Sequence, residues 1–198
     1  MGALLTSDKP DEGWWWNVPK DADLEQGQII QGLYLPRFIE SELMELPNRK
    51  KKNATVNFFH TDAIVVTQSC DFRNASRALV TSIISVGQAR SKHDFDDEAL
   101  QDIRDQRRPD WIMLANPNDP NDKEGCVLVD LRYITPLELK YLQTMAKQKE
   151  HRPGLRPPYL EHFSAACGRY LARVALPKDL PIFHDRSKRE DGAGNAKQ

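Results

Sequence analysis

The sequence predicts an α+β fold, a small and partly closed antiparallel β-barrel followed by two helices. Short apolar, β-branched runs separated by polar turns fill the chain between residues 25 and 135, and such runs are typical of buried strands. Beyond residue 135 the apolar residues recur at intervals of three and four, which is the spacing of amphipathic helices. Strands followed by helices favour a sheet with the helices packed on it.

Residues 1–24 are predicted to form an irregular N-terminal arm, because they contain prolines and many charged side chains. This arm carries three adjacent tryptophans, Trp14, Trp15 and Trp16. Each can bury ~150–250 Å². In one interpretation they clamp the arm onto the domain, and in the other they form a stacking platform or an anchor for a partner. The sequence leaves both open.

Residues 25–135 form the predicted barrel domain. The connection over residues 71–76 is short enough for a hairpin loop. Residues 95–108 are acidic at their start and basic at their end, which suits a helix dipole. The predicted strands are residues 27–35, 62–68, 77–86, 111–115 and 126–134.

Residues 136–180 are predicted to be a helical extension packed on the barrel. Thr135, Pro136 and Glu138 approximate a capping box, which predicts a helix that runs to about residue 148. A second helix is expected from Tyr159 to about Val174, because its apolar residues form one stripe. Residues 181–198 are charged and have no apolar anchor, so a disordered tail is expected there.

Composition narrows the classes of function. The formal net charge of −1 gives no global attraction to nucleic acid or to an anionic membrane. No apolar run approaches the roughly 20 residues needed to span a bilayer, and no signal-peptide pattern is seen. Three cysteines without a close pair fit a reducing, cytoplasmic compartment and argue against a cysteine zinc site. Without a nucleotide-binding, zincin or hydrolase motif, no metal or cofactor is expected.

The first candidate site is the polar cluster in which the apolar run of residues 62–68 ends, namely Gln68, Ser69, Cys70 and Asp71. These side chains could contact a ligand, or Cys70 could act as a nucleophile, for which a base or cation would have to activate the thiol. A structural role is the alternative, with Cys70 as a small buried side chain and Asp71 in an Asx-turn. The sequence does not decide between them.

A second candidate is an anion site made of Arg73, Arg77, Arg90 and Lys92. These cations flank the run over residues 77–86. If the strand ends lie together, the four side chains would form a modest site suited to phosphate. The alternative is a set of unrelated solvated charges.

The segments 27–30, 63–67 and 78–83 resemble, in their order, the SH3-like barrel of the PemK/MazF-type toxin family. In that family Gly-Asp-Ile/Val opens the barrel, and two later apolar strands end near small hydroxyl residues. The similarity covers residues 27–90, and Thr81 and Ser82 are the nearest match to the hydroxyl position. The Arg-Pro that usually precedes the second core strand is replaced by His60-Thr61-Asp62. The resemblance implies an SH3-like barrel, a metal-independent endoribonuclease of a toxin–antitoxin module, an antitoxin partner and a homodimer.

We therefore expect a bacterial conflict or toxin–antitoxin-type protein that binds or cleaves RNA or another nucleic acid. In cleavage, a cation such as Arg73, Arg77 or Arg90 would stabilise the charged phosphate transition state, while a general base activates the ribose hydroxyl. Thr81 and Ser82 are catalytic candidates through the resemblance alone. The alternative is a non-catalytic protein–protein interaction subunit of a larger, defence-type complex. The triple tryptophan, the amphipathic C-terminal helix and the lack of a convincing catalytic constellation support this alternative. Whether the chain is an enzyme stays open at this point.

Overall fold

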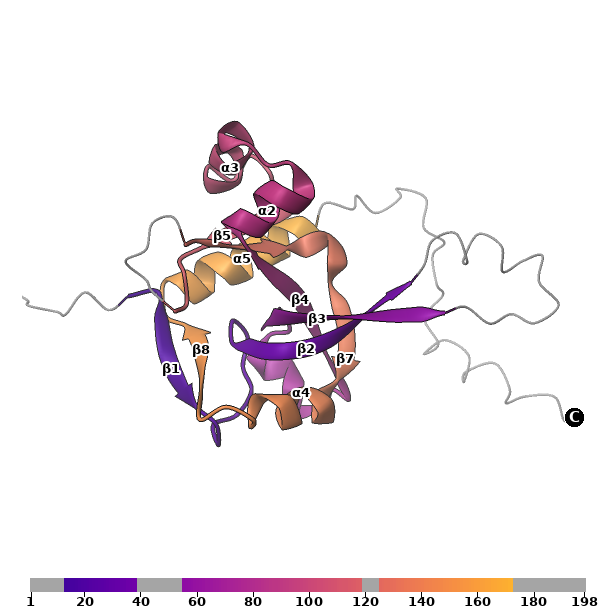
Figure 1. Cartoon of the computed structure of the whole chain (residues 1–198). Coiled ribbons are helices and arrows are strands. Elements are labelled where there is room, and N and C mark those ends of the chain that lie inside the picture. The colour runs from indigo at the N-terminus through magenta and orange to yellow at the C-terminus, as the bar shows by residue number, and fades with distance from the viewer. Residues whose placement is uncertain (1–12, 39–54, 119–124, 173–198) are drawn as a thin grey trace, which may run out of the picture.

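A computed structural model describes residues 13–38, 55–118 and 125–172 of the chain (Figure 1). Within these ranges the protein has an α+β fold with antiparallel strand pairing. The strands are β1 (Trp15–Pro19), β2 (Ile29–Phe38), β3 (Val56–Val65), β4 (Arg77–Ser85), β5 (Trp111–Leu114), β6 (Val127–Asp130), β7 (Thr135–Glu138) and β8 (His151–Leu155). The helices are α2 (Val86–His93), α3 (Asp97–Arg104), α4 (Leu139–Ala146) and α5 (Tyr159–Leu171).

The main sheet has the strand order β2-β3-β4-β6-β5. Strand β4 divides its far edge between two partners, since its first half pairs with β7 and its last residues pair with β6. The sheet therefore branches at β4 and does not curl back onto β2. Among the described residues it is not closed into a barrel, and that part of the sequence prediction is wrong. Strands β1 and β8 form a separate two-stranded ribbon, joined to the sheet through the bridge between Gln28 and Gly154.

Helices pack against both faces of the main sheet. Along β3 the side chains alternate, as a strand requires. Ile64 belongs to a core with Phe163 and Cys167 of α5. Its neighbours Ala63 and Val65 belong to a second core with α4. Helices α2 and α3 cover strands β5 and β6 in a third core.

Several predicted elements are confirmed. The runs at 27–35, 77–86 and 111–115 correspond to β2, β4 and β5, and the helix predicted from Tyr159 is α5. Strands β3 and β4 form the expected antiparallel pair, and a 3₁₀ turn over Ser69–Arg73 tightens their connection. The tail predicted at 181–198 lies outside the described residues.

The helix expected from residue 136 begins later, because residues Thr135–Glu138 form β7. Thr135 donates its hydroxyl to the carbonyl of Tyr133, not to a helical turn. Glu138 lies opposite Arg77 on β4, and its carboxylate accepts a 2.9 Å hydrogen bond from Arg77 Nε. Pairing with β4 thus overrides the local capping signal, and α4 begins at Leu139.

Part of the N-terminal arm is also regular, since Trp15–Pro19 form β1 against β8. The buried guanidinium of Arg152 fixes the chain that follows β1. It donates to Gln28 Oε1 at 2.8 Å and to the carbonyls of Pro19, Ala22 and Asp23 at 2.8–3.0 Å. Residues 15–23 are therefore tied to the domain by a ladder and by a side-chain network.

Candidate functional site

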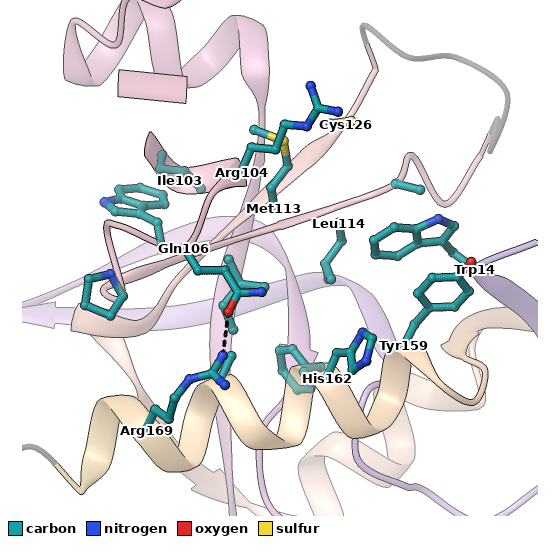
Figure 2. Close-up of a pocket in the computed structure, with 16 residues that line it drawn as sticks. Trp14, Ile103, Arg104, Gln106, Met113, Leu114, Cys126, Tyr159, His162 and Arg169 are labelled. Atoms are coloured by element: carbon teal, nitrogen blue, oxygen red, sulfur yellow. Dashed lines mark hydrogen bonds between the residues drawn. The ribbon is translucent and has the colours of Figure 1, made fainter. Parts of the chain in front are cut away.

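A groove of about 600 Å³ lies between α5 and the edge strand β5 (Figure 2). Its residues come from four separate segments of the chain. They are Trp14, Ile103, Arg104, Gln106, Pro109, residues 111–115, Cys126, Tyr159, His162, Phe163, Ala166 and Arg169. A volume of this size, with mostly apolar walls and a few polar groups, is typical of ligand-binding clefts.

Strand β5 contributes all of its residues to the groove, which we call the α5–β5 groove. The strand is the last in the sheet order, and its partner among the described residues is β6. Helix α3 contacts β5, and α5 packs on the opposite side through Phe163. Figure 2 shows Met113 toward Arg104 and Leu114 toward α5. The strand edge therefore lies between two helices.

Both ends of the groove are defined by specific contacts. At one end the ring of Trp14 stacks on Tyr159, with a centroid distance of 4.1 Å and an interplanar angle of 11°. The neighbouring indole of Trp15 donates to the carbonyl of Ala115 at 3.0 Å. At the other end Arg169 donates to Gln106 Oε1 at 2.8 Å, a bond drawn in Figure 2. These contacts link the helices to both ends of β5.

The charges that line the groove have one sign. Among the described residues that line it, Arg104, His162 and Arg169 are the ionisable nitrogen side chains, and none is an aspartate or a glutamate. The bond from Arg169 goes to a neutral amide, so it does not neutralise the guanidinium. Arg104 and His162 are exposed to solvent. An apolar groove with cations at its rim is suited to an apolar ligand that carries a negative charge.

The three tryptophans have different surroundings. Trp15 is buried in a core beneath the sheet and fastens β1 to the end of β5. Trp14 is partly buried and lines the groove, whereas Trp16 is 39% exposed. Trp15 therefore fastens the N-terminal arm to the domain, while a role in partner binding stays a proposal for Trp14 and Trp16.

The cluster that ends β3 lies in the 3₁₀ turn at Ser69–Arg73, and its side chains are exposed. Ser69 accepts a 3.1 Å hydrogen bond from the backbone of Gln26. The thiol of Cys70 donates to Gln68 Oε1 and to Asp71 Oδ1, at 3.9 and 3.6 Å. Neither acceptor is a cation or a histidine, so these contacts do not supply the activation that a nucleophilic thiol needs.

The four cations predicted as one anion site lie at opposite ends of β4. Arg73 and Arg77 stand at its beginning, and Arg90 and Lys92 lie in α2 after its end. A strand of nine residues separates the two pairs by ~26 Å. Arg77 is paired with Glu138, and Arg90 is paired with Asp97. The four residues are not brought together, and the prediction of a single site is wrong.

The hydroxyl residues Thr81 and Ser82 are buried inside the sheet. Thr81 donates its hydroxyl to the carbonyl of Asp130. The catalytic group expected from Arg73, Arg77 and these two residues is therefore not assembled on an accessible surface. The reason is the twofold alternation of β4, which turns most of its centre toward the two cores.

Two further observations concern the chemistry of the described residues. Burial raises the pKa of the Cys167 thiol from its ordinary value of 9.0 to about 12. Among residues 13–38, 55–118 and 125–172, no three histidine, cysteine or acidic side chains lie together as a metal would require. In the same ranges, no helix has the length and apolar character needed to cross a bilayer.

Comparison with family models, with curated proteins and with solved structures found no match to this chain. The site is therefore described from its geometry alone. Sequence reasoning missed Arg104, Gln106, His162 and Arg169, because the groove gathers them from segments far apart in the chain. Two signals pointed toward the groove, namely Trp14 and the apolar stripe of α5 that includes Ala166.

Proposed function

We propose that this chain is a non-catalytic protein-interaction module whose partner protein binds in the α5–β5 groove. The observation that carries the proposal is the groove itself, a cleft of about 600 Å³ with apolar walls, cationic rims and no carboxylate among the described lining residues. Aromatic side chains and arginines beside an apolar surface are the residues enriched at protein interfaces. Trp14 and Tyr159, and the cations Arg104 and Arg169, supply both kinds here.

The composition of the groove supports binding more than catalysis. General acid–base chemistry needs a positioned donor and acceptor of suitable pKa. In residues 13–38, 55–118 and 125–172, His162 is the one histidine that lines the groove, and no carboxylate lines it to orient that ring. The residues predicted for catalysis lie elsewhere and apart. A surface that only binds a partner requires no such pair of proton donor and acceptor.

The experiment compares two neighbouring alanines on α5. Ala166 lines the groove, whereas Ala165 is exposed and does not line it. The tagged wild type, Ala166→Trp and Ala165→Trp are used to capture proteins from the source cells, and captured proteins are quantified by mass spectrometry. A partner that binds in the groove is lost with Ala166→Trp and retained with Ala165→Trp. Equal capture by both variants, or capture of nothing by the wild type, would contradict the proposal.

A second candidate function is binding of RNA or another nucleic acid, and one observation favours it. Tyr34 and Phe58 are 55% and 63% exposed on the β2–β3 hairpin. The ring centroids of Tyr34 and His60 lie 5.1 Å apart. On the opposite face of this strand pair, Arg37 lies 5.9 Å from the centre of the exposed Tyr133 ring. Exposed aromatic rings beside cations provide surfaces on which unpaired bases stack.

This candidate includes the toxin–antitoxin reading, with metal-independent cleavage of RNA, a homodimer and an antitoxin partner. The meander β2-β3-β4 supports a relation to the SH3-like core, and that relation is a proposal. The test is the affinity for a labelled single-stranded RNA at two salt concentrations, together with total RNA integrity after induction. Salt-sensitive binding that Phe58→Ala weakens would support the candidate. No binding and intact RNA would exclude it.

A further inference from the structure

Building on the proposed function, we infer that the occupant of the groove is an extended, acidic segment of the partner protein, added as a strand to the edge of β5 that pairs with no other strand among the described residues. Strand addition is a common mode of peptide recognition, in which backbone bonds give affinity and alternate side chains enter pockets. Three features support it: the backbone pattern of β5, the walls on either side of the strand, and the charges.

The backbone pattern leaves Met113 directed away from β6. The amide of Leu131 donates to the carbonyl of Asp110 at 2.9 Å, so these two residues form a hydrogen-bonded pair. In an antiparallel ladder such pairs alternate with non-bonded ones. The register then makes Ile112–Val129 and Leu114–Val127 bonded pairs and Met113–Leu128 a non-bonded pair. The N–H and C=O of Met113 thus point toward the edge that borders the groove.

The walls suit the alternating side chains of an added strand. Its residues would point in turn toward α3 and toward α5, as Met113 and Leu114 do in Figure 2. On one side they would meet Ile103, and on the other Phe163 and Ala166. Because both walls are apolar, consecutive side chains of the added strand can be apolar, as in strands that are buried on both faces.

The ends of the groove limit the length of the added strand. The floor runs from Trp111 to Ala115, which corresponds to ~13 Å of extended chain. The Arg169–Gln106 bond and the Trp14–Tyr159 stack lie at its two ends. An added strand of four or five residues fits this span.

The charges favour an acidic segment over a basic one and over a nucleic acid. Arg104 and Arg169 lie at the α3 and α5 rims, and within the described part of the chain the lining holds no carboxylate that competes for them. The apolar walls between these rims offer little to a phosphate backbone. An aspartate, a glutamate or a terminal carboxylate of the peptide could accept from either guanidinium.

The test begins with a display library of random 12-residue peptides, selected on the full-length chain. Binders are counter-selected on Ala166→Trp, which leaves the peptides that need the groove. Affinities of synthetic copies are then measured for the wild type, Arg104→Gln and Met113→Pro. Proline at Met113 removes an outward N–H without touching the bonds to β6. The controls are Met113→Ala and Lys92→Gln, since Lys92 carries the same charge outside the groove.

We expect selected peptides that have a short run of consecutive apolar residues, because both walls are apolar, together with an acidic residue. Their affinity should fall about tenfold with Arg104→Gln, the size of one charge-assisted bond. It should also fall with Met113→Pro but not with either control. N-methylation of successive peptide amides should weaken binding at every second position, because alternate amides face β5.

Groove-dependent peptides that tolerate Met113→Pro or N-methylation at all positions would overturn strand addition, and peptides that lack acidic residues would overturn the acidic character of the segment. Both results leave the proposed function intact. No groove-dependent peptide would overturn this inference, while capture of a partner by Ala165→Trp alone would still support the interaction module. Tighter peptide binding after deletion of residues 1–12 or 173–198 would assign the groove to the chain itself. A dimer lost with Ala166→Trp would assign it to a second copy.

Discussion

Replacement of Arg152 by methionine should lower the free energy of unfolding by about 3 kcal/mol. The guanidinium is 3% exposed and donates four bonds of 3.0 Å or less, to Gln28 and to the carbonyls of Pro19, Ala22 and Asp23. A hydrogen bond to a charged group contributes ~1.5–3 kcal/mol. Two effects offset part of this sum, because burial lowers the pKa of Arg152 and solvent can reach the part-buried carbonyls after the substitution. The expected net loss therefore corresponds to about two of the four bonds, at ~1.5 kcal/mol each.

Urea denaturation measures this loss. With a dependence on urea of about 2 kcal/mol per molar, the midpoint should fall by ~1.5 M. Lys20→Met is the control, because Lys20 pairs with Glu150 on the surface, with side chains 40% and 76% exposed, and such pairs contribute little. A midpoint shift for Arg152→Met no larger than that of Lys20→Met would refute the reasoning.

Three further predictions concern side chains singled out by the sequence or by burial. Iodoacetamide should label the exposed Cys70 in the folded protein but reach the buried Cys167 only after denaturant is added, and equal rates for the two thiols in buffer would contradict the structure. The pKa of about 12 keeps Cys167 protonated in the folded state, while the unfolded thiol ionises near 9.0. The unfolded state therefore binds fewer protons above pH 9, and stability falls as pH rises, by about 1.4 kcal/mol at pH 10 relative to Cys167→Ala. If the free energies of unfolding of the wild type and of Cys167→Ala changed equally with pH, the direction of the pKa shift or the burial of Cys167 would be wrong. Thr81→Val should cost about 1–2 kcal/mol, because it leaves the carbonyl of Asp130 without its donor. Denaturation measures the loss, and an unchanged midpoint would argue against a structural Thr81.

The elements that were predicted well have local signals. The apolar residues of β4 and the stripe of α5 can be recognised within ten to fifteen residues, because burial follows the period of the element itself. The start of α4 could not be recognised in this way. Thr135 and Glu138 have the spacing of a helix cap, yet pairing with Arg77–Val80 of β4 decides their conformation. That partner lies about sixty residues away.

The site was harder to predict for the same reason. Trp14, Gln106, Tyr159 and Arg169 meet only after β1, α3 and α5 have packed around β5. No spacing along the chain connects them. By contrast, the clusters at Gln68–Asp71 and at Arg90–Lys92 were predicted as sites because their residues are close together in the sequence. The structure places them on exposed segments at different ends of β4.

Photo-cross-linking from α5 tests the central claim most directly. A benzophenone amino acid is introduced at His162, which lines the groove, or at Glu161, which is exposed but does not line it. After irradiation in the source cells, position 162 should give a discrete adduct with a protein, and position 161 should not. An adduct with nucleic acid, or the same products from both positions, would contradict the assignment of the groove to a protein partner.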